Sequence, residues 1–421
     1  MAGEQVSALR LTLHGQLVGY VAGYAHNRTV LSLAPSFVED ANRPALTLSL
    51  ANPATFATRA GKGFPVATNM QLHPLLSNLL PEGALRQLLA QRLKVHEHNE
   101  FPLLVHLGGD LPGALIAEPV AAEAIPDAAF GDRGRLDRVA VATVDRVAHF
   151  SLAGVQMKFS MHQRDGRYQL GDTAAPGDWI IKTPSTVHDH VPLNEYTCMH
   201  LAALAGVDIP EIRLVELDKL ERLPQIKLPD EGYAYGIRRF DRAEGKRVHA
   251  EDFAQVLFAY AADKYQRASY EQIARLIYQN TYSGQRDVVQ MAVRLLVNIL
   301  LGNGDAHLKN WSILYPDGVN PVLSPAYDIL FTKAYIPAEQ HYALNMAQTK
   351  QWYEVSLEHF RRWARRADLP ESPILYNLKA AIDKARALWP AALRDSPMHE
   401  AHKAVLREHW RALHGDFRID S

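Results

Sequence analysis

The sequence predicts an α+β fold of two lobes, in which a β-rich N-terminal lobe carries an accessory domain and the C-terminal lobe is all-helical. Two observations predict this arrangement. Short β-favouring runs separated by glycine, asparagine and proline dominate the chain up to about residue 240, whereas helical periodicity dominates beyond Asp241. With 421 residues, 48% of them hydrophobic, the chain is also long enough for two or three units that each bury a core.

The accessory domain is predicted to span residues 1–125. Alternating apolar and polar residues predict a small antiparallel sheet with strands at 9–15, 16–24, 29–35 and 45–50. The chain then changes to a helical period between residues 72 and 93, where leucines gather on one face (Leu85, Leu88, Leu89 and Leu93). A stretch rich in alanine, aspartate, glycine and proline follows and is typical of a linker.

The second unit, residues 126–240, combines strands with one clear helix. The strands are expected at 158–162, 179–184, 211–217 and 233–240. The helix is expected at 194–206, with Gly206 ending it as glycine commonly does at a helix C-terminus.

The third unit, residues 241–421, is expected to be almost entirely helical in period. The predicted helices lie at 251–262, 270–280, 287–302, 355–366, 374–389 and 399–414.

Composition excludes several classes of protein. Lys and Arg total 45 against 46 Asp and Glu, so the overall charge gives no footprint for nucleic acid or an anionic membrane, and any DNA contact would be local or made through a partner. The single cysteine, Cys198, excludes an internal disulfide framework and suits a reducing compartment. The N-terminus has no secretory pattern and no segment is apolar enough to span a membrane, so we expect a cytoplasmic protein.

The most informative stretch is GNGDAHLKNWSIL, in which a helix gives way to Asp305, with Asn310 five positions later and a strand after it. Kinases use such an Asp-x4-Asn loop for a carboxylate that receives a hydroxyl proton and an amide that holds a metal. Asp328, in PVLSPAYDIL, follows another short strand and would be a second carboxylate for Mg²⁺, which prefers hard oxygen ligands. Taken alone, Asp305 and Asn310 could equally be ordinary turn residues.

Two upstream segments lie in the order that a two-lobed kinase requires. Lys182 ends the apolar run WIIK and precedes the helix that carries Glu195, which resembles the lysine–carboxylate clamp on nucleotide phosphates. The segment SLAGVQMKFS, with Gly154 and Lys158, could cradle phosphates with its backbone amides, although it matches neither GxGxxG nor the Walker pattern. Solvation of an exposed lysine and a helix-dipole role for Glu195 are the plain alternatives.

Together these motifs resemble HipA-type kinases. The resemblance rests on SLAGVQMKFS, IIKTP with NEYTCMHLAALAGVDIP, YGIRRFDR, GNGDAHLKNWSIL and LSPAYDIL, and on NLLPEGALRQLL and HLGGDLPGAL in the accessory domain. It covers most of the chain up to about residue 330 and implies a bilobal kinase-like fold that uses ATP and Mg²⁺.

The resemblance also implies a role for each matching residue. Asp305 would be the catalytic carboxylate, Asn310 and Asp328 the Mg²⁺ ligands, and Lys182 the phosphate-contacting lysine. The remaining nucleotide contacts would come from the phosphate loop (Ala153, Gly154, Val155, Gln156 and Lys158), the hinge (Arg238, Arg239 and Phe240) and the catalytic loop (His307 and Lys309). Ser151 would be the serine whose autophosphorylation ejects the phosphate loop and switches the kinase off, because the added charge repels ATP.

Family membership further implies partners. These would be a helix-turn-helix antitoxin of the HipB type, operator DNA reached mainly through that antitoxin, and a protein substrate such as an aminoacyl-tRNA synthetase, whose phosphorylation would arrest translation and growth and cause persistence. Two other hypotheses remain open from the residues: a small-molecule phosphotransferase of the aminoglycoside or choline kinase kind, and a non-catalytic corepressor that only holds the antitoxin on DNA.

Overall fold

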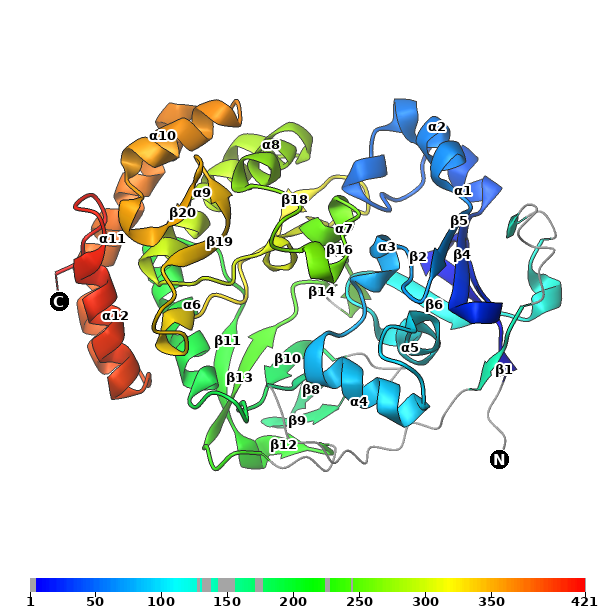
Figure 1. Ribbon diagram of the computed structural model, residues 1–421, viewed down its shortest axis with the longest axis horizontal. Coiled ribbons are helices and arrows are strands. Elements are labelled where there is room, and N and C mark those ends of the chain that lie inside the picture. The colour runs from blue at the N-terminus through cyan, green and yellow to red at the C-terminus, as the bar shows by residue number, and fades with distance from the viewer. Residues whose placement is uncertain are drawn as a thin grey trace.

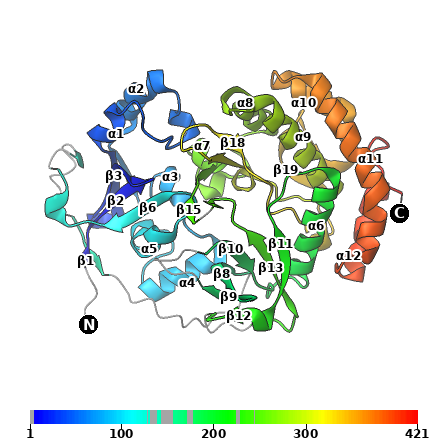
Figure 2. The same ribbon diagram turned by 180° about the vertical axis from the view of Figure 1, so that it is seen from behind.

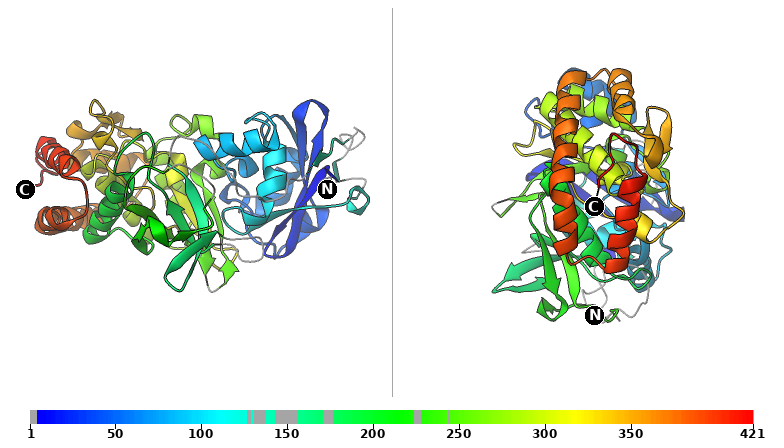
Figure 3. Two further views of the ribbon diagram at one scale, coloured as in Figure 1. Left: turned by 90° about the horizontal axis from the view of Figure 1, so that it is seen from below. Right: turned by 90° about the vertical axis from the view of Figure 1, so that its left-hand side faces the viewer.

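The computed structural model describes residues 5–126, 129–130, 138–142, 156–170, 177–223, 228–243 and 245–420. The elements follow the long axis of the molecule, with β1 (Gln5–Val6) near one end and α12 (Glu400–Ala412) at the other (Figure 1). The view from behind gives the same order (Figure 2), and the view from below keeps the N-terminal strands and the C-terminal helices at opposite ends (Figure 3).

A five-stranded antiparallel sheet forms the N-terminal domain, in the order β5-β4-β3-β2-β6. Its strands are β2 (Ala8–Leu13), β3 (Gln16–Tyr24), β4 (Arg28–Leu33), β5 (Val66–Asn69) and β6 (Leu115–Pro119). The helices of the domain are α1 (Pro35–Glu39), α2 (Pro53–Gly63), α3 (Pro74–Ser77), α4 (Gly83–Leu93) and α5 (Glu100–Leu107). Leu9, Leu11 and Leu13 are buried while Arg10 between them is exposed, so the alternation in the sequence sets the face of this sheet. The first three predicted strands are confirmed. The leucine-rich helical segment predicted between residues 72 and 93 forms two helices, α3 and α4, with a break at residues 78–82.

The strand predicted at 45–50 is wrong. These residues form a single 3-10 turn, Leu48–Leu50, and join no sheet. The backbone of this segment bonds to the C-terminal lobe instead, because the Leu48 amide donates to the carboxylate of Glu251 and the Ala45 amide to the Gly318 carbonyl. Its alternating apolar residues therefore cover an interface between domains rather than one face of a sheet.

The second sheet has six strands in the order β11-β13-β10-β8-β9-β12. They are β8 (Lys158–Arg164), β9 (Arg167–Leu170), β10 (Trp179–Lys182), β11 (Ile212–Glu216), β12 (Leu220–Glu221) and β13 (Tyr233–Arg238). Helix α6 (Val191–Ala205) contacts β11 and β13 and ends at Gly206, whose φ of 98° is a left-handed conformation that glycine adopts without strain. The strands and the helix predicted for this unit are confirmed.

The N-terminal domain packs against this second sheet, and its contacts extend past residue 125, where the predicted boundary lay. Leu88 of α4 packs in the same core as Met161 and Trp179 of the second sheet. Strand β7 (Val141–Ala142) pairs with β1, so residues 138–142 still lie against the N-terminal domain.

The C-terminal lobe is mainly helical. Its helices are α7 (Phe253–Val256), α8 (Tyr270–Asn280), α9 (Gly284–Leu300), α10 (Leu357–Arg366), α11 (Glu371–Asp395) and α12. Capping boxes start α7, α8 and α10 at Asp252, Ser269 and Ser356. Helix α9 is the centre of the largest core, and from Met291 to Leu300 every one of its side chains is buried.

The prediction that this lobe is all-helical is wrong. It also contains β14 (Arg242–Ala243), β15 (Lys246–Arg247), β16 (His249–Asp252), β17 (Ser312–Tyr315), β18 (Val322–Leu323), β19 (His341–Met346) and β20 (Thr349–Gln351). The helix predicted at 251–262 shrinks to α7, because Asp252 is still paired in β16 and Phe258, at a φ of 48°, ends the helical stretch. Runs of four apolar residues fit a strand as well as a helix, so periodicity cannot separate the two.

Buried polar contacts fasten the N-terminal domain to the C-terminal lobe. Glu251 of β16 accepts hydrogen bonds from Thr47 Oγ1 (2.7 Å), the Leu48 amide (2.7 Å) and Tyr315 Oη (2.6 Å). Nearby, Asp241 pairs with Arg239 and Arg242 and accepts from the Gly113 amide. Such buried groups are stable only when they are hydrogen-bonded, so these contacts fix how the domains sit together.

Candidate active site

The loop that carries Asp305 begins where α9 ends, and α12 holds that end in place. The last carbonyl groups of a helix lack partners within it. Those of Ile299 and Leu300 accept hydrogen bonds from His409 Nε2 (2.9 Å) and Trp410 Nε1 (3.0 Å). Gly302 then turns the chain at a φ of 55°, where a Cβ would lie 3.3 Å from the ring of His409.

Asp305 is held by its neighbours, and its side chain remains 46% exposed. Carboxylate oxygen Oδ1 accepts a hydrogen bond of 2.5 Å from the hydroxyl of Tyr265. The side-chain nitrogen Nδ2 of Asn310 donates to the backbone carbonyl of Asp305 (2.7 Å), and this bond closes the Asp-x4-Asn loop as a compact turn. A fixed, exposed carboxylate of this kind can accept a proton from a hydroxyl group brought to it.

Lys182 of β10 lies between two carboxylates. Its ammonium group is 2.5 Å from Glu195 Oε1 of α6 and also contacts Oδ1 of Asp328. Lys158 of β8 is 3.5 Å from the other oxygen of Asp328. Burial alone would raise the pKa of Asp328, but the ammonium groups of Lys158 and Lys182 hold it below its ordinary value. The predicted pairing of Lys182 with Glu195 is confirmed, and Asp328 joins it.

Asn303 connects the two carboxylate segments. Its side-chain oxygen accepts from the Asp305 amide (3.0 Å), and its nitrogen donates to Asn298 Oδ1 (2.7 Å) and to the Asp328 carbonyl (3.3 Å). The residue is fully buried. Asn303 was predicted only as part of the GNGDAHLKN motif. Its position between Gly302 and Gly304 already indicated a tight turn at this point of the chain.

His307 and Lys309 lie on the same loop but face different surroundings. His307 is buried with its Nε2 3.9 Å from Asp305 Oδ1, and burial lowers its pKa. The ammonium group of Lys309 bonds to Asp252 Oδ2 (2.8 Å) and to the carbonyl of Asn78 (2.9 Å) in the N-terminal domain. A contact between Lys309 and a nucleotide therefore stays a prediction.

The predicted hinge, residues 238–240, connects β13 to the C-terminal lobe. The Arg238 amide donates to the Glu211 carbonyl and the Arg239 amide to the Asp178 carbonyl, and the Arg239 side chain is buried in its pair with Asp241. The ring of Phe240 lies 5.6 Å from that of Tyr327, beside Asp328. The hinge role also stays a prediction.

Ala153, Gly154 and Val155 of the predicted phosphate loop lie outside the described residues, as does the predicted autophosphorylation site Ser151. Gln156 and Lys158 are described. The Gln156 side-chain nitrogen is buried and makes no hydrogen bond in the described part of the chain. Lys158 begins β8 and reaches Asp328.

These residues fit a magnesium–nucleotide group. The carboxylate of Asp328 and the amide oxygen of Asn310 are the hard donors that Mg²⁺ prefers. Lys158 and Lys182 supply positive charge at the same place, and the buried side-chain nitrogen of Gln156 is a donor that meets no acceptor among the described residues. The arrangement can hold phosphates next to a carboxylate that accepts protons.

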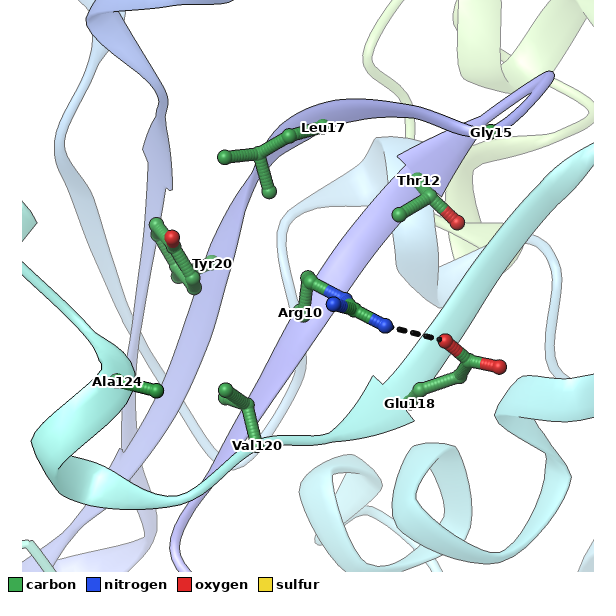
Figure 4. Close-up of a pocket in the computed structure, with 8 residues that line it drawn as sticks. All are labelled: Arg10, Thr12, Gly15, Leu17, Tyr20, Glu118, Val120 and Ala124. Carbon is green, nitrogen blue, oxygen red and sulfur yellow. Dashed lines mark hydrogen bonds and ion pairs between the residues drawn. The ribbon is translucent and has the colours of Figure 1, made fainter.

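The protein also has a pocket away from this site. A pocket of about 400 Å³ opens on the N-terminal sheet, and Figure 4 shows Arg10 of β2 pairing with Glu118 of β6 (3.0 Å) within it. None of its lining residues belongs to the site described above, so it plays no part in the chemistry of Asp305. Among the described residues, no helix is both long and apolar enough to cross a membrane.

The comparisons with known proteins agree with this geometry. Residues 150–389 match the family model of the HipA-like C-terminal domain, and residues 9–118 match that of the HipA N-terminal domain. Y4dM of Sinorhizobium fredii, provisionally named a kinase, is 38% identical over 94% of both chains. The serine/threonine-protein kinase toxin HipA of Shewanella oneidensis is 26% identical over 67% of this chain and 70% of its own.

A solved structure has the same fold. The complex of Shewanella oneidensis HipA, HipB and operator DNA contains a chain that superposes with a TM-score of 0.69 at 20% identity and covers 95% of this chain and 94% of its own.

The two sheets, the helical lobe and the lysine–carboxylate cluster between them define a kinase-like protein. The particular family follows from the matches to both domain models, which together span most of the sequence. This chain belongs to the HipA family.

Proposed function

We propose that the chain is an ATP- and Mg²⁺-dependent serine/threonine protein kinase that acts as the toxin of a HipBA-type toxin–antitoxin module. The convergence of Lys182, Glu195 and Asp328, linked through Asn303 to Asp305, carries the proposal. A kinase needs these groups together, because phosphoryl transfer is catalysed mainly by positioning and by stabilising charge.

Each side chain has a proposed task in the reaction. Asp305 accepts the proton of the acceptor hydroxyl, Lys182 binds the nucleotide phosphates, and Asp328 and Asn310 hold Mg²⁺. When bound, Mg²⁺ neutralises charge on the transferred phosphoryl group. Lys158 is the more exposed of the two lysines on Asp328, at 51%, so its ammonium group is free to join Lys182 at the phosphates.

We further propose the regulation and partners that the family suggests. Ser151 would be the autophosphorylation site, and the loop that follows it, Ala153 to Lys158, would cover the phosphates. A HipB-like helix-turn-helix antitoxin would bind the chain and connect it to operator DNA in the cytoplasm. An aminoacyl-tRNA synthetase is the proposed kind of protein substrate, and growth arrest the proposed outcome.

The test is phosphoryl transfer from radiolabelled ATP and Mg²⁺ to the purified chain and to a bacterial lysate. We expect label in polypeptides, and replacing Asp305 by Asn should lower transfer by about 10³-fold, since the amide cannot accept the proton. Asp317→Asn, the same chemical change in an exposed turn, is the matched control and should leave transfer unchanged.

Three results would contradict the proposal. Label that enters only small metabolites would favour a small-molecule phosphotransferase. An Asp305→Asn protein that transfers phosphate and arrests growth as the wild type does would refute the catalytic role of this carboxylate, and absence of transfer by the wild type would favour a corepressor.

A further inference from the structure

A tyrosine outside the predicted site contacts the proposed catalytic carboxylate. The hydroxyl of Tyr265 donates to Asp305 Oδ1 at 2.5 Å. Its ring also lies against His307 at 5.1 Å between centroids, nearly perpendicular to it. Burial, followed by the hydrogen bond with Asp305, raises the pKa of Tyr265, so the hydroxyl keeps its proton and acts only as a donor. One oxygen of Asp305 is thereby fixed, and the other is left for an acceptor hydroxyl.

The segment that carries Tyr265 is tied to the N-terminal domain. Lys264, its neighbour, pairs with Glu82 Oε2 at 2.9 Å, and the Lys264 carbonyl accepts from the Leu308 amide of the catalytic loop (3.3 Å). Glu82 precedes α4, and its other oxygen lies 3.5 Å from Lys309 Nζ. The carboxylate of Glu82 therefore contacts Lys264, which precedes Asp305 in the sequence, and Lys309, which follows it.

The two lysines keep the Glu82 carboxylate ionised, which strengthens its ion pairs with them. Burial alone would raise the pKa of Glu82, but Lys309 and Lys264 lower it below its ordinary value. The two lysine side chains are 14% and 19% exposed, so solvent weakens these pairs less than it does surface pairs.

The domain that presents Glu82 is itself docked on the C-terminal lobe. Gln255 of α7 donates to the Leu75 carbonyl of α3 (2.9 Å). Asn78, at the end of α3, donates to the Ala259 carbonyl (2.8 Å) and accepts from Lys309. Glu82 follows Asn78 by four residues, so α3 sets where its carboxylate lies.

We propose that Glu82 and Tyr265 are positioning residues for phosphoryl transfer, by which the N-terminal domain sets the orientation of Asp305. This inference rests on the proposed kinase function. It gives the N-terminal domain a task in catalysis itself, apart from any role in binding partners.

The experiment measures turnover and KM for Mg²⁺·ATP with the full chain, using label transferred to itself and to lysate polypeptides. Tyr265→Phe keeps the ring on His307 and removes only the hydroxyl, so turnover should fall about tenfold while KM stays unchanged. Glu82→Gln should give a similar loss. The double variant should lose no more than the worse single variant, because both residues act through Asp305.

Melting temperatures separate positioning from folding. The variants should melt as the wild type does, and if Glu82→Gln fails to fold, Lys264→Met reports on the same contact. Glu118→Gln is the matched control: this glutamate of the same domain also forms an ion pair, with Arg10 (Figure 4), but it is half exposed and should leave turnover unchanged.

The outcomes distinguish this inference from the proposed function. If the wild type transfers no label, the proposed function fails and the inference with it. If the wild type transfers label and either single variant turns over at the wild-type rate, or if the two losses multiply in the double variant, only the positioning role is wrong.

Discussion

The ammonium group of Lys182 keeps two carboxylates, Glu195 and Asp328, together in a buried place. Its side chain is 6% exposed and that of Glu195 is 1% exposed. Carboxylates so close to each other repel unless a cation stands between them. Lys182 thus has a structural task in addition to its proposed contact with phosphates.

Replacing Lys182 by Met should therefore destabilise the protein as well as abolish phosphoryl transfer. Loss of one partner leaves a buried charge uncompensated, which costs about 3 kcal/mol. The midpoint of urea unfolding checks this expectation. Lys219→Met, which removes an exposed lysine paired with Glu216, should leave the midpoint where it was, and an equal shift in both variants would contradict the account.

Individual site residues could be predicted from the sequence only where they belong to a recognisable motif. Asp305, Asn310, Asp328, Lys182 and Glu195 could be predicted because their order and spacing along the chain resemble those of known kinases. Tyr265 and Glu82 could not, because the contacts they make join residues far apart in sequence: Lys264 and Glu82 are separated by 182 positions. Polar residues in loops have no periodicity that would reveal such partners.

Among the elements, α12 has the clearest structural role, since it completes the end of α9. Trp410 and His409 donate to the last carbonyl groups of α9, directly before the loop of Asp305. The sequence predicted both helices from their periodicity. It did not predict that they meet, because helical periodicity identifies a buried face and not the neighbour that covers it.

Replacing Trp410 by smaller side chains should lower the free energy of unfolding in steps. Trp410→Phe removes the hydrogen bond to the Leu300 carbonyl and should cost about 1 kcal/mol. Trp410→Ala also empties a fully buried site and should cost about 4 kcal/mol. Urea unfolding measures both, and Tyr376→Ala on α11, where the side chain is 75% exposed, should have no effect. Equal losses in the two Trp410 variants would show that packing of the ring contributes nothing.

Across the whole molecule, the contacts of Glu251 with residues 47 and 48 join the N-terminal domain to the C-terminal lobe. Burial raises the pKa of Glu251 to about 7, although Tyr315, Thr47 and Leu48 donate to it. The protonated form is therefore favoured in the folded protein more than in the unfolded chain. The stability that this provides is complete below the ordinary value near 4.5 and is lost as the pH rises through about 7.

Glu251→Gln should remove this dependence, since an amide does not titrate. Relative to the wild type, the variant should gain stability as the pH is raised from 5 to 8, by about 3 kcal/mol over the full range. Melting temperatures of the two proteins at matched pH values give the difference. A difference that stays constant with pH would show that Glu251 is ionised in the folded protein throughout.

The order of β-rich and helix-rich segments was predictable, and the contacts between them were not. Two β-rich units followed by a helical lobe could be recognised from changes in period. The short strands β17 and β18, which precede Asp328, were expected, whereas β16, the hairpin of β19 and β20, and the 3-10 turn at Leu48 were missed. β16 and the 3-10 turn are held by partners far along the chain, because β16 pairs with β17 and the Leu48 amide bonds to Glu251.

The loop of Asp305 receives its neighbours from opposite ends of the sequence: Asn78 holds Lys309 from one side, and Trp410 closes α9 from the other. During translation the loop leaves the ribosome about a hundred residues before Trp410 does. Asp305 is therefore synthesised before Trp410, the residue that closes the end of α9 in the folded protein.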